Sequence, residues 1–377
     1  MKYFSSLVVL ATSFLMMVDS HTIFTTLFVN DVSQGDGTCV RMNMNPQHCT
    51  FPIENLASDD MACGVNGSQP VAFTCPASTG GKLTFEWRAW ADLEQPGSID
   101  ISHKGPCAVY GKQVKDMTKD SAAGAGWIKL WDEGYDDSSG KWCTEKLIDN
   151  NGLMSIDIPD FLTTGYWLMR PELLALHDAD KGDPQFYVGC AQVFLDNGNT
   201  APLNVPDEYS VSIPGYVKAG EPSVSFNIYQ PKFPYPMPGP KVYKPAESQT
   251  TAASTESAKQ TEGKVPSDYL IKNANWVGVE VADYSTEAGC WDASSACFDQ
   301  AGTCYNTAPP TGSANCHVWE DKCDGISAAC SAGNSKGPPN RGQLLPSKDP
   351  APPSDIPGAA NARKLRKQRI RSTVSGV

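Results

Sequence analysis

Short runs of alternating apolar and polar residues recur along residues 21–243, separated by turns rich in Gly, Pro, Asn and Asp. The clearest run is Lys82–Trp90 (KLTFEWRAW), in which Leu83, Phe85 and Trp87 occupy alternate positions. A period of two is typical of a strand that buries one face. Similar runs predict strands at Gly152–Ile158, Gly165–Arg170, Gln185–Phe194 and Val224–Tyr229, and Asp137–Asn151 has room for a short helix. So many short strands predict one all-β domain, an antiparallel β-sandwich.

A period of seven replaces this pattern after residue 275. Six Cys form two trios: Cys290, Cys297 and Cys304, then Cys316, Cys323 and Cys330. Positions seven apart lie on nearly one face of a helix, drifting by about 20° per heptad. The turn Pro309–Gly312 separates the trios, so the pattern predicts an antiparallel helical hairpin. Antiparallel geometry then favours the ladder disulfides Cys290–Cys330, Cys297–Cys323 and Cys304–Cys316. Such bridges would stabilise a unit too small to bury a core of its own.

Composition divides the chain into five regions. Residues 1–20 have the pattern of a secretory signal peptide: Lys2, the apolar run Leu7–Leu15, then Val18 and Ser20 before the expected cleavage site. Residues 21–243 form the β domain, 244–268 a Ser/Thr-rich linker, 269–335 the six-cysteine hairpin domain, and 336–377 a Pro/Gly-rich and then basic tail that we expect to be disordered. The basic run Arg363–Arg371 either contacts an anionic wall polymer or is simply solvated.

Charge and cysteine content restrict the class of protein. The net charge of −12 argues against nucleic acid as a partner, since phosphates would repel an acidic chain. No run after the signal approaches the roughly 20 apolar residues of a membrane span. All thirteen Cys follow residue 20, which favours an oxidising compartment and leaves at least one Cys without a partner in the chain. We therefore expect a secreted monomer that contacts neither nucleic acid nor membranes, with Asn66 in the sequon Asn66-Gly67-Ser68 as its glycosylation site.

The position of His21 suggests metal chemistry. Cleavage after Ser20 would make His21 the first residue, so that its α-amino group and ring Nδ1 could chelate one ion. Copper prefers such nitrogen ligands in planar arrangements. Among the other His, His103 is the best candidate for a further ligand, because the Gly105-Pro106 that follows it would hold its ring in a loop at a strand end.

Residues 165–190 predict a second group of polar side chains near this position. A strand ending near Leu176 and a strand beginning at Gln185 can pair as a hairpin, which brings His177, Gln185 and Tyr187 toward one another. Gln185 and Tyr187 then share a face of their strand. A phenol beside copper can take an axial direction, and His and Gln can hydrogen-bond an oxygen ligand. The alternative is that Tyr187 belongs to the core and His177 is an ordinary strand-end residue.

Together these motifs resemble the fungal lytic polysaccharide monooxygenases of auxiliary activity family nine. The resemblance rests on His21-Thr22-Ile23-Phe24, Ser102-His103-Lys104-Gly105-Pro106, Leu174-Ala175-Leu176-His177, Gln185-Phe186-Tyr187 with Cys190, and Gly239-Pro240 near Tyr235. It covers residues 21–243 and implies an immunoglobulin-like (fibronectin-III-like) sandwich with a flat copper face. It also implies that His21 and His103 hold one copper ion, that Tyr187 is its axial neighbour, and that His177 and Gln185 surround the site.

The resemblance extends to the disulfides. It implies a long bridge, Cys63–Cys190. Cys107 departs from the family pattern, in which an aliphatic residue often follows Gly-Pro, and Cys143 is its plausible partner. A local bridge, Cys39–Cys49, would then leave Cys75 unpaired.

The implied activity is oxidative cleavage of β-1,4-glucan chains, cellulose first, at C1 and/or C4, with O2 or H2O2 and an external electron donor such as a small reductant or a secreted dehydrogenase. Tyr235 is a candidate for stacking on sugar rings. The alternatives are a monooxygenase acting on hemicellulose and a non-catalytic secreted copper-binding protein of the same fold. A hydrolase is disfavoured, because no pair of carboxylates stands out. The hairpin domain is either a glycan-binding module, with Trp276, Trp291, Tyr305 and Trp319 as its aromatic surface, or a structural appendage.

Overall fold

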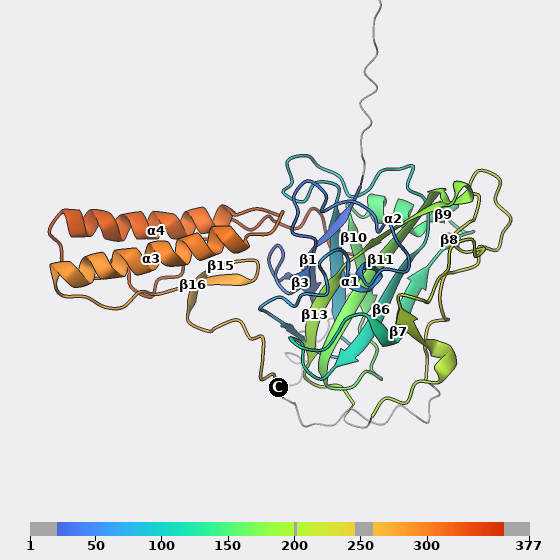
Figure 1. The fold of residues 1–377 in the computed structure, drawn as a ribbon, viewed down its shortest axis with the longest axis horizontal. Coiled ribbons are helices and arrows are strands. Elements are labelled where there is room, and N and C mark those ends of the chain that lie inside the picture. The colour runs from blue at the N-terminus through green and yellow to red at the C-terminus, as the bar shows by residue number, and fades with distance from the viewer. Residues whose placement is uncertain (1–20, 200–201, 246–258, 358–377) are drawn as a thin grey trace, which may run out of the picture.

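The computed structural model describes residues 21–199, 202–245 and 259–357. The expected signal peptide, most of the expected linker and the basic run of the tail lie outside these residues. Figure 1 shows a β-sandwich from one side of which a pair of helices projects. Within the described ranges, no helix combines the length and the apolar character needed to cross a bilayer.

Two sheets make up the sandwich. The smaller sheet has the order β10 (Leu153–Asp157), β5 (Lys82–Arg88), β1 (Ile23–Val29), β2 (Val32–Ser33). The larger has the order β14 (Ser210–Ile213), β7 (Gly124–Glu133), β6 (Cys107–Val114), β11 (Gly165–Asp178), β13 (Cys190–Leu195), β3 (Val40–Arg41), with β12 (Asp183–Val188) paired to β11 and β4 (Cys75–Ala77) to β13. Leu27 and Phe85 of the first sheet share one core with Val109, Trp167 and Leu173 of the second. The predicted sandwich is confirmed, and its pairs are antiparallel except β4 with β13.

The predicted strands are mostly present. β5 and β10 match the runs that predicted them, β11 continues from its predicted start to Asp178, and the predicted helix is α2 (Cys143–Asp149). Gly189 divides the run at 185–194 into β12 and β13, which pair with different parts of β11. The strand predicted at Val224–Tyr229 is wrong. Val224 and Phe226 of this run are buried in an irregular loop instead, where Phe226 packs edge-on against Tyr235 at 5.0 Å between ring centroids. The remaining short elements are α1 (Asp60–Cys63), β8 (Tyr135–Asp136), β9 (Lys141–Trp142), η1 (Ala179–Lys181) and η2 (Asp207–Tyr209).

The helical hairpin has the predicted form. α3 (Glu287–Thr307) and α4 (Ala314–Ser331) run side by side, and the three predicted ladder disulfides join them. A small sheet of β15 (Tyr269–Asn273) and β16 (Trp276–Val279), which the sequence analysis did not predict, packs on the helices. Trp276 and Trp319 are buried in this unit, so their prediction as surface residues is wrong.

The hairpin unit is docked on the sandwich through the turn between β15 and β16. Asn275 Nδ2 donates to Gly37 O at 2.7 Å, and its Oδ1 accepts from Cys39 N at 3.1 Å. Thr38 Oγ1 donates to Ala274 O at 3.0 Å. The end of the predicted linker is also packed, since Gln260 is buried and donates to Thr74 O at 2.9 Å. The second unit is therefore held in a defined orientation.

The tail returns to the sandwich, in contrast to the predicted disorder. The chain after residue 336 first lies along the hairpin unit, where Leu345 N donates to Leu270 O at 2.8 Å. Ile356 is then buried against Phe28 and Leu153 of the smaller sheet. We call residues 345–357 the strap. Apolar burial and backbone hydrogen bonds order this strap despite its high Pro content.

A buried ion pair lies within the larger sheet. Arg170 and Glu172, both on β11, are fully buried, and Arg170 Nη1 donates to Glu172 Oε2 at 2.5 Å. Arg170 Nε also donates to Met61 O at 2.9 Å, and the hydroxyl of Tyr216 donates to Glu172. Every charge in this group has a partner, as burial requires.

Candidate metal centre

Three rings from distant parts of the chain meet near the start of β1. His21 lies two residues before β1, His103 lies in the loop before β6, and Tyr187 lies on β12. The Tyr187 ring centroid is 6.3 Å from that of His21 and 6.0 Å from that of His103. The fold thus brings together the three residues predicted to surround a metal.

Backbone hydrogen bonds fix the loop that carries His103. Leu176 N donates to Lys104 O at 2.9 Å and Leu174 N donates to Pro106 O at 3.0 Å, so the loop lies along the end of β11. On its other side, Gly105 N donates to Thr144 Oγ1 at 2.9 Å. The predicted Cys107–Cys143 disulfide, next to these contacts, ties the loop to the start of α2.

The environment of His103 suits a metal ligand. Its Nδ1 lies 3.1 Å from Ser102 Oγ, which leaves Nε2 as the nitrogen available to an ion. Burial, followed by the nearby His177, lowers the pKa of His103 to about 4. The imidazole is therefore neutral at ordinary pH, which is the form that binds metals.

The second predicted group is also assembled. The Tyr187 hydroxyl donates a hydrogen bond to Gln185 Oε1 at 2.8 Å, so the two side chains share a face of β12, as predicted. The His177 ring lies 4.3 Å from the His103 ring, centroid to centroid. Nδ1 of His177 is buried and has no hydrogen-bond partner among the described residues. A side chain with this unused capacity can bind a further polar ligand.

The donor set fits copper under one condition. Among residues 21–199, 202–245 and 259–357, no group of three or more His, Cys, Asp or Glu side chains could hold a metal ion. His21 and His103 supply imidazole nitrogens, which suit copper. A third nitrogen must come from another kind of donor, and the α-amino group of a chain beginning at His21 is the one that the sequence offers.

One predicted disulfide near the site is wrong. Cys63–Cys190 is present, but Cys39 pairs with Cys75 rather than Cys49, and Cys49 is a buried free thiol. Sheet pairing explains the difference. β3 and β4 follow each other along one edge of β13, where Gln192 N donates to Cys39 O and Val193 pairs with Cys75. The prediction paired Cys39 with Cys49 because the two are close in sequence, whereas the strand register brings Cys39 next to Cys75.

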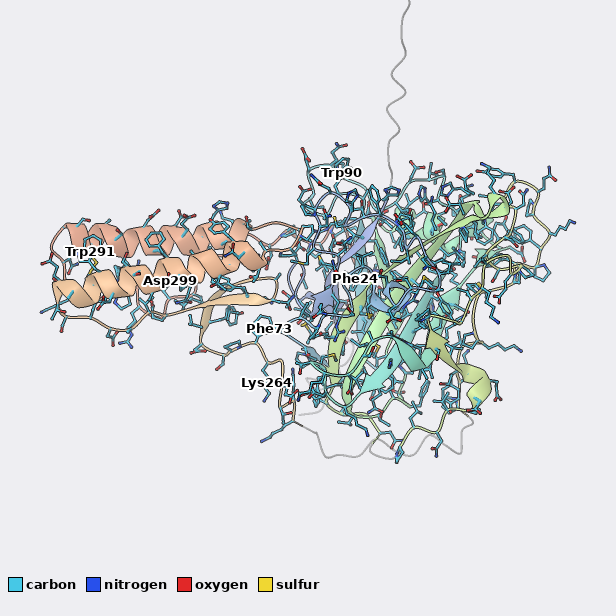
Figure 2. The ribbon with its side chains drawn as sticks, viewed as in Figure 1. Phe24, Phe73, Trp90, Lys264, Trp291 and Asp299 are labelled. Carbon is cyan, nitrogen blue, oxygen red and sulfur yellow. A yellow bond between two sulfur atoms is a disulfide. The ribbon has the colours of Figure 1, made fainter. Side chains whose placement is uncertain are left out.

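The predicted sugar contact Tyr235 is also wrong. Tyr235 is only 9% exposed, and its hydroxyl donates to Ser223 O at 2.7 Å. Other aromatic side chains of the sandwich are exposed instead. Trp90, at the upper edge of the sandwich in Figure 2, is 40% exposed, and Tyr229 is 66% exposed. Trp90 and Tyr229 end the predicted runs Lys82–Trp90 and Val224–Tyr229, but both lie in loops of the structure, so alternation could not identify them as exposed. Asn66, the predicted glycosylation site, is exposed in a turn.

Gly105→Ala should disturb the His103 loop. A Cβ at this position would lie 1.9 Å from the carbonyl oxygen of Leu174, which is backbone and cannot turn aside. We expect a loss of about 1–3 kcal/mol in the free energy of unfolding, as for other overpacked sites. Gly302→Ala on α3 is the control: its Cβ meets nothing within 4 Å, so a small gain is expected. Equal thermal midpoints for the two variants would contradict the predicted clash.

Comparison with known proteins agrees with this geometry. A family model, Auxiliary Activity family 9 (formerly GH61), matches residues 21–235. The AA9 family lytic polysaccharide monooxygenase H of Botryotinia fuckeliana (strain B05.10) is 56% identical over 331 residues, covering 85% of this chain and 75% of that protein. The AA9 family lytic polysaccharide monooxygenase C of Aspergillus tamarii is 50% identical over 341 residues, covering 86% and 89% respectively.

Solved structures agree as well. The structure named CvAA9A superposes with a TM-score of 0.53 at 35% identity, covering 59% of this chain and 98% of that one. The two sequence alignments are longer than residues 21–243, so those relatives share part of the C-terminal region too. The family match spans the sandwich and every residue that forms the candidate centre. The chain therefore belongs to auxiliary activity family 9.

Proposed function

We propose that this protein is a secreted, copper-dependent lytic polysaccharide monooxygenase that oxidatively cleaves β-1,4-glucan chains at C1 and/or C4, using O2 or H2O2 and an external electron donor. The observation that carries the proposal is the convergence of His21, His103 and Tyr187, with Gln185 bonded to Tyr187. The names of the relatives support the same activity.

In this proposal His21 holds copper through its ring and, after removal of residues 1–20, its α-amino group. The pKa of an α-amino group is low for an amine, about 8, so losing its proton to bind metal costs little near neutral pH. His103 contributes Nε2. Bound copper would supply one-electron redox chemistry toward the oxidant.

The other residues act around that centre. Tyr187 would close the inner side of the centre, since it is fully buried and its ring lies 6.3 Å from that of His21 and 6.0 Å from that of His103. Gln185 Oε1 accepts the hydrogen bond of the Tyr187 hydroxyl, and Nε2 donates to Asp183 Oδ2 at 3.4 Å, which leaves the second N–H of the amide as a donor. His177 is the second donor beside His103. Together they would orient the oxidant and hold its protons.

Tyr229 and Trp90 are the proposed sugar contacts in place of Tyr235. Asn227 Nδ2, two residues before Tyr229, donates to Asp180 Oδ2 at 2.8 Å, which ties the Tyr229 loop to η1, directly after His177 and Asp178. An exposed ring anchored beside the centre can stack on a glucan chain.

Two residues weigh against the alternative, a copper-binding protein without activity. A storage site requires only ligands to the ion. Gln185 and His177 would serve no purpose there, because neither contributes to the two-imidazole donor set.

Mass spectrometry of soluble products tests the proposal. The secreted, copper-loaded protein is incubated with amorphous cellulose and ascorbate. We expect oligosaccharides oxidised to aldonic acids or C4 gem-diols, and their ratio would give the regioselectivity. Native sugars alone would indicate hydrolysis. An absence of products from amorphous cellulose and from hemicellulose, with copper still bound one-to-one, would favour the copper-binding alternative.

A further inference from the structure

A row of aromatic side chains runs along α3. Each of its members follows a ladder cysteine: Trp291 after Cys290, Phe298 after Cys297, and Tyr305 after Cys304. The cysteines are buried, whereas Trp291 is 42% and Phe298 36% exposed. Figure 2 shows Trp291 toward the end of the hairpin that lies away from the sandwich. We call these three residues the aromatic row.

The spacing of the row has a chemical counterpart. Seven residues of α-helix rise about 10.5 Å, and the rings turn by only about 20° between neighbours. This rise is close to the two-sugar repeat of an extended β-1,4-linked glycan, in which every second ring presents the same orientation. We propose that the aromatic row binds an extended, uncharged β-1,4-linked glycan by stacking on alternate sugar rings.

The row is rigid, which favours stacking. Three disulfides join the two helices at the level of its three members. Tyr305 is fixed by its hydroxyl, which donates to Glu320 Oε2 at 2.5 Å and lies 2.7 Å from His317 Nδ1. Rings that are already ordered lose little conformational entropy when a ligand binds.

Charge on the hairpin selects an uncharged occupant. α3 contains no Lys or Arg, and Asp292 and Asp299 are exposed beside Trp291 and Phe298. These carboxylates would repel nucleic acid and acidic polysaccharides. Toward a neutral glycan they offer acceptors for sugar hydroxyl groups, as glycan recognition requires.

The proposal goes beyond the oxidative activity proposed above. Because the β15–β16 turn and the strap fix the hairpin to the sandwich, a glycan on the aromatic row would be held at a set position relative to the His21 face. The row would add a second point of attachment to the same polymer.

Binding of the full-length protein to microcrystalline cellulose tests the proposal. The chelator EDTA is present, so that the measurement does not depend on copper chemistry. We expect the double variant Trp291→Ala/Phe298→Ala to bind roughly tenfold more weakly than the parent. The matched control Trp291→Tyr/Phe298→Tyr keeps the rings and should bind as the parent does. Val32→Ala, an exposed apolar residue on β2, controls for nonspecific loss of apolar surface.

Two further measurements make the result decisive. Thermal unfolding should be the same for parent and variants, and Phe298→Asn alone replaces the double variant if that variant unfolds early. Oxidation of soluble cello-oligosaccharides should be unchanged in all of them, because the row is outside the candidate centre. Binding within twofold of the parent would overturn the proposal, as would a parent dimer that the double variant converts to a monomer. If the parent itself oxidised no cello-oligosaccharides, that result would count against the proposed oxidative activity and not against glycan binding by the aromatic row.

Discussion

Replacing His103 with alanine should abolish copper binding and polysaccharide oxidation together. The loop carrying His103 is fixed by backbone hydrogen bonds to β11 and by the Cys107–Cys143 bridge, so the fold should survive while the ligand is lost. His21 would then be the one remaining imidazole of the pair, and no group of three or more His, Cys, Asp or Glu side chains in the part of the chain that the structure describes could hold the ion instead. Calorimetric titration with Cu²⁺ would measure the loss, alongside product formation from amorphous cellulose.

Gln185→Ala is the matched control for this experiment. Gln185 accepts a hydrogen bond from Tyr187 and does not belong to the imidazole pair, so copper affinity should remain near the parental value. Turnover should fall by about 10–100-fold, the usual effect of removing a group that orients metal chemistry. Tight one-to-one binding by His103→Ala would refute the ligand assignment. A parental oxidation rate in Gln185→Ala would remove the role given to that amide.

Arg170→Met should be the most destabilising substitution at a distance from the centre. It removes the partner of the fully buried Glu172 and leaves that carboxylate with only the Tyr216 hydroxyl. Breaking a buried pair in this way costs about 3–5 kcal/mol. For a domain of this size the thermal midpoint should fall on the order of 10 °C.

The double variant Arg170→Met/Glu172→Gln separates the cost of charge from the cost of packing. Gln keeps an acceptor for Tyr216 but carries no charge, so most of the lost stability should return. Thermal melts followed by circular dichroism would compare the two variants. If the double variant melted as early as Arg170→Met, an isolated buried charge would not be the cause.

Local pattern was enough to predict those parts of the fold that depend on neighbouring residues. The heptads of α3 and α4 follow from each helix burying its cysteine face, and alternation was enough to predict the strand β5, although β5 is buried on both faces. The position of Tyr187 and Gln185 on one side of β12 needs no more than strand alternation. The meeting of His21 with His103 was different: it was expected from family resemblance, because no spacing links two loops so far apart.

What could not be predicted depends on register between distant segments. Cys39 meets Cys75 only because β3 and β4 share an edge of β13. Tyr235 carries the same aromatic signal as an exposed ring, and only packing against Phe226 and Trp142 decides that it is buried. The order of the strap was also unpredictable, because its composition indicates disorder. It depends on the packing of one residue, Ile356, against Phe28 and Leu153.

The docked hairpin also bears on how such proteins diversify. Accessory domains joined by a flexible linker can be exchanged between genes, because neither the accessory domain nor the catalytic domain has a surface adapted to the other. Here Gly37 lies against Ala274 and Pro309, where a Cβ would come within 3.0 Å of the Ala274 side chain, and Ile356 covers sheet residues of the sandwich. A transplanted hairpin would meet the wrong surface, and a sandwich expressed without it would expose apolar side chains. The two units should therefore be inherited together, with substitutions on one side matched by substitutions on the other.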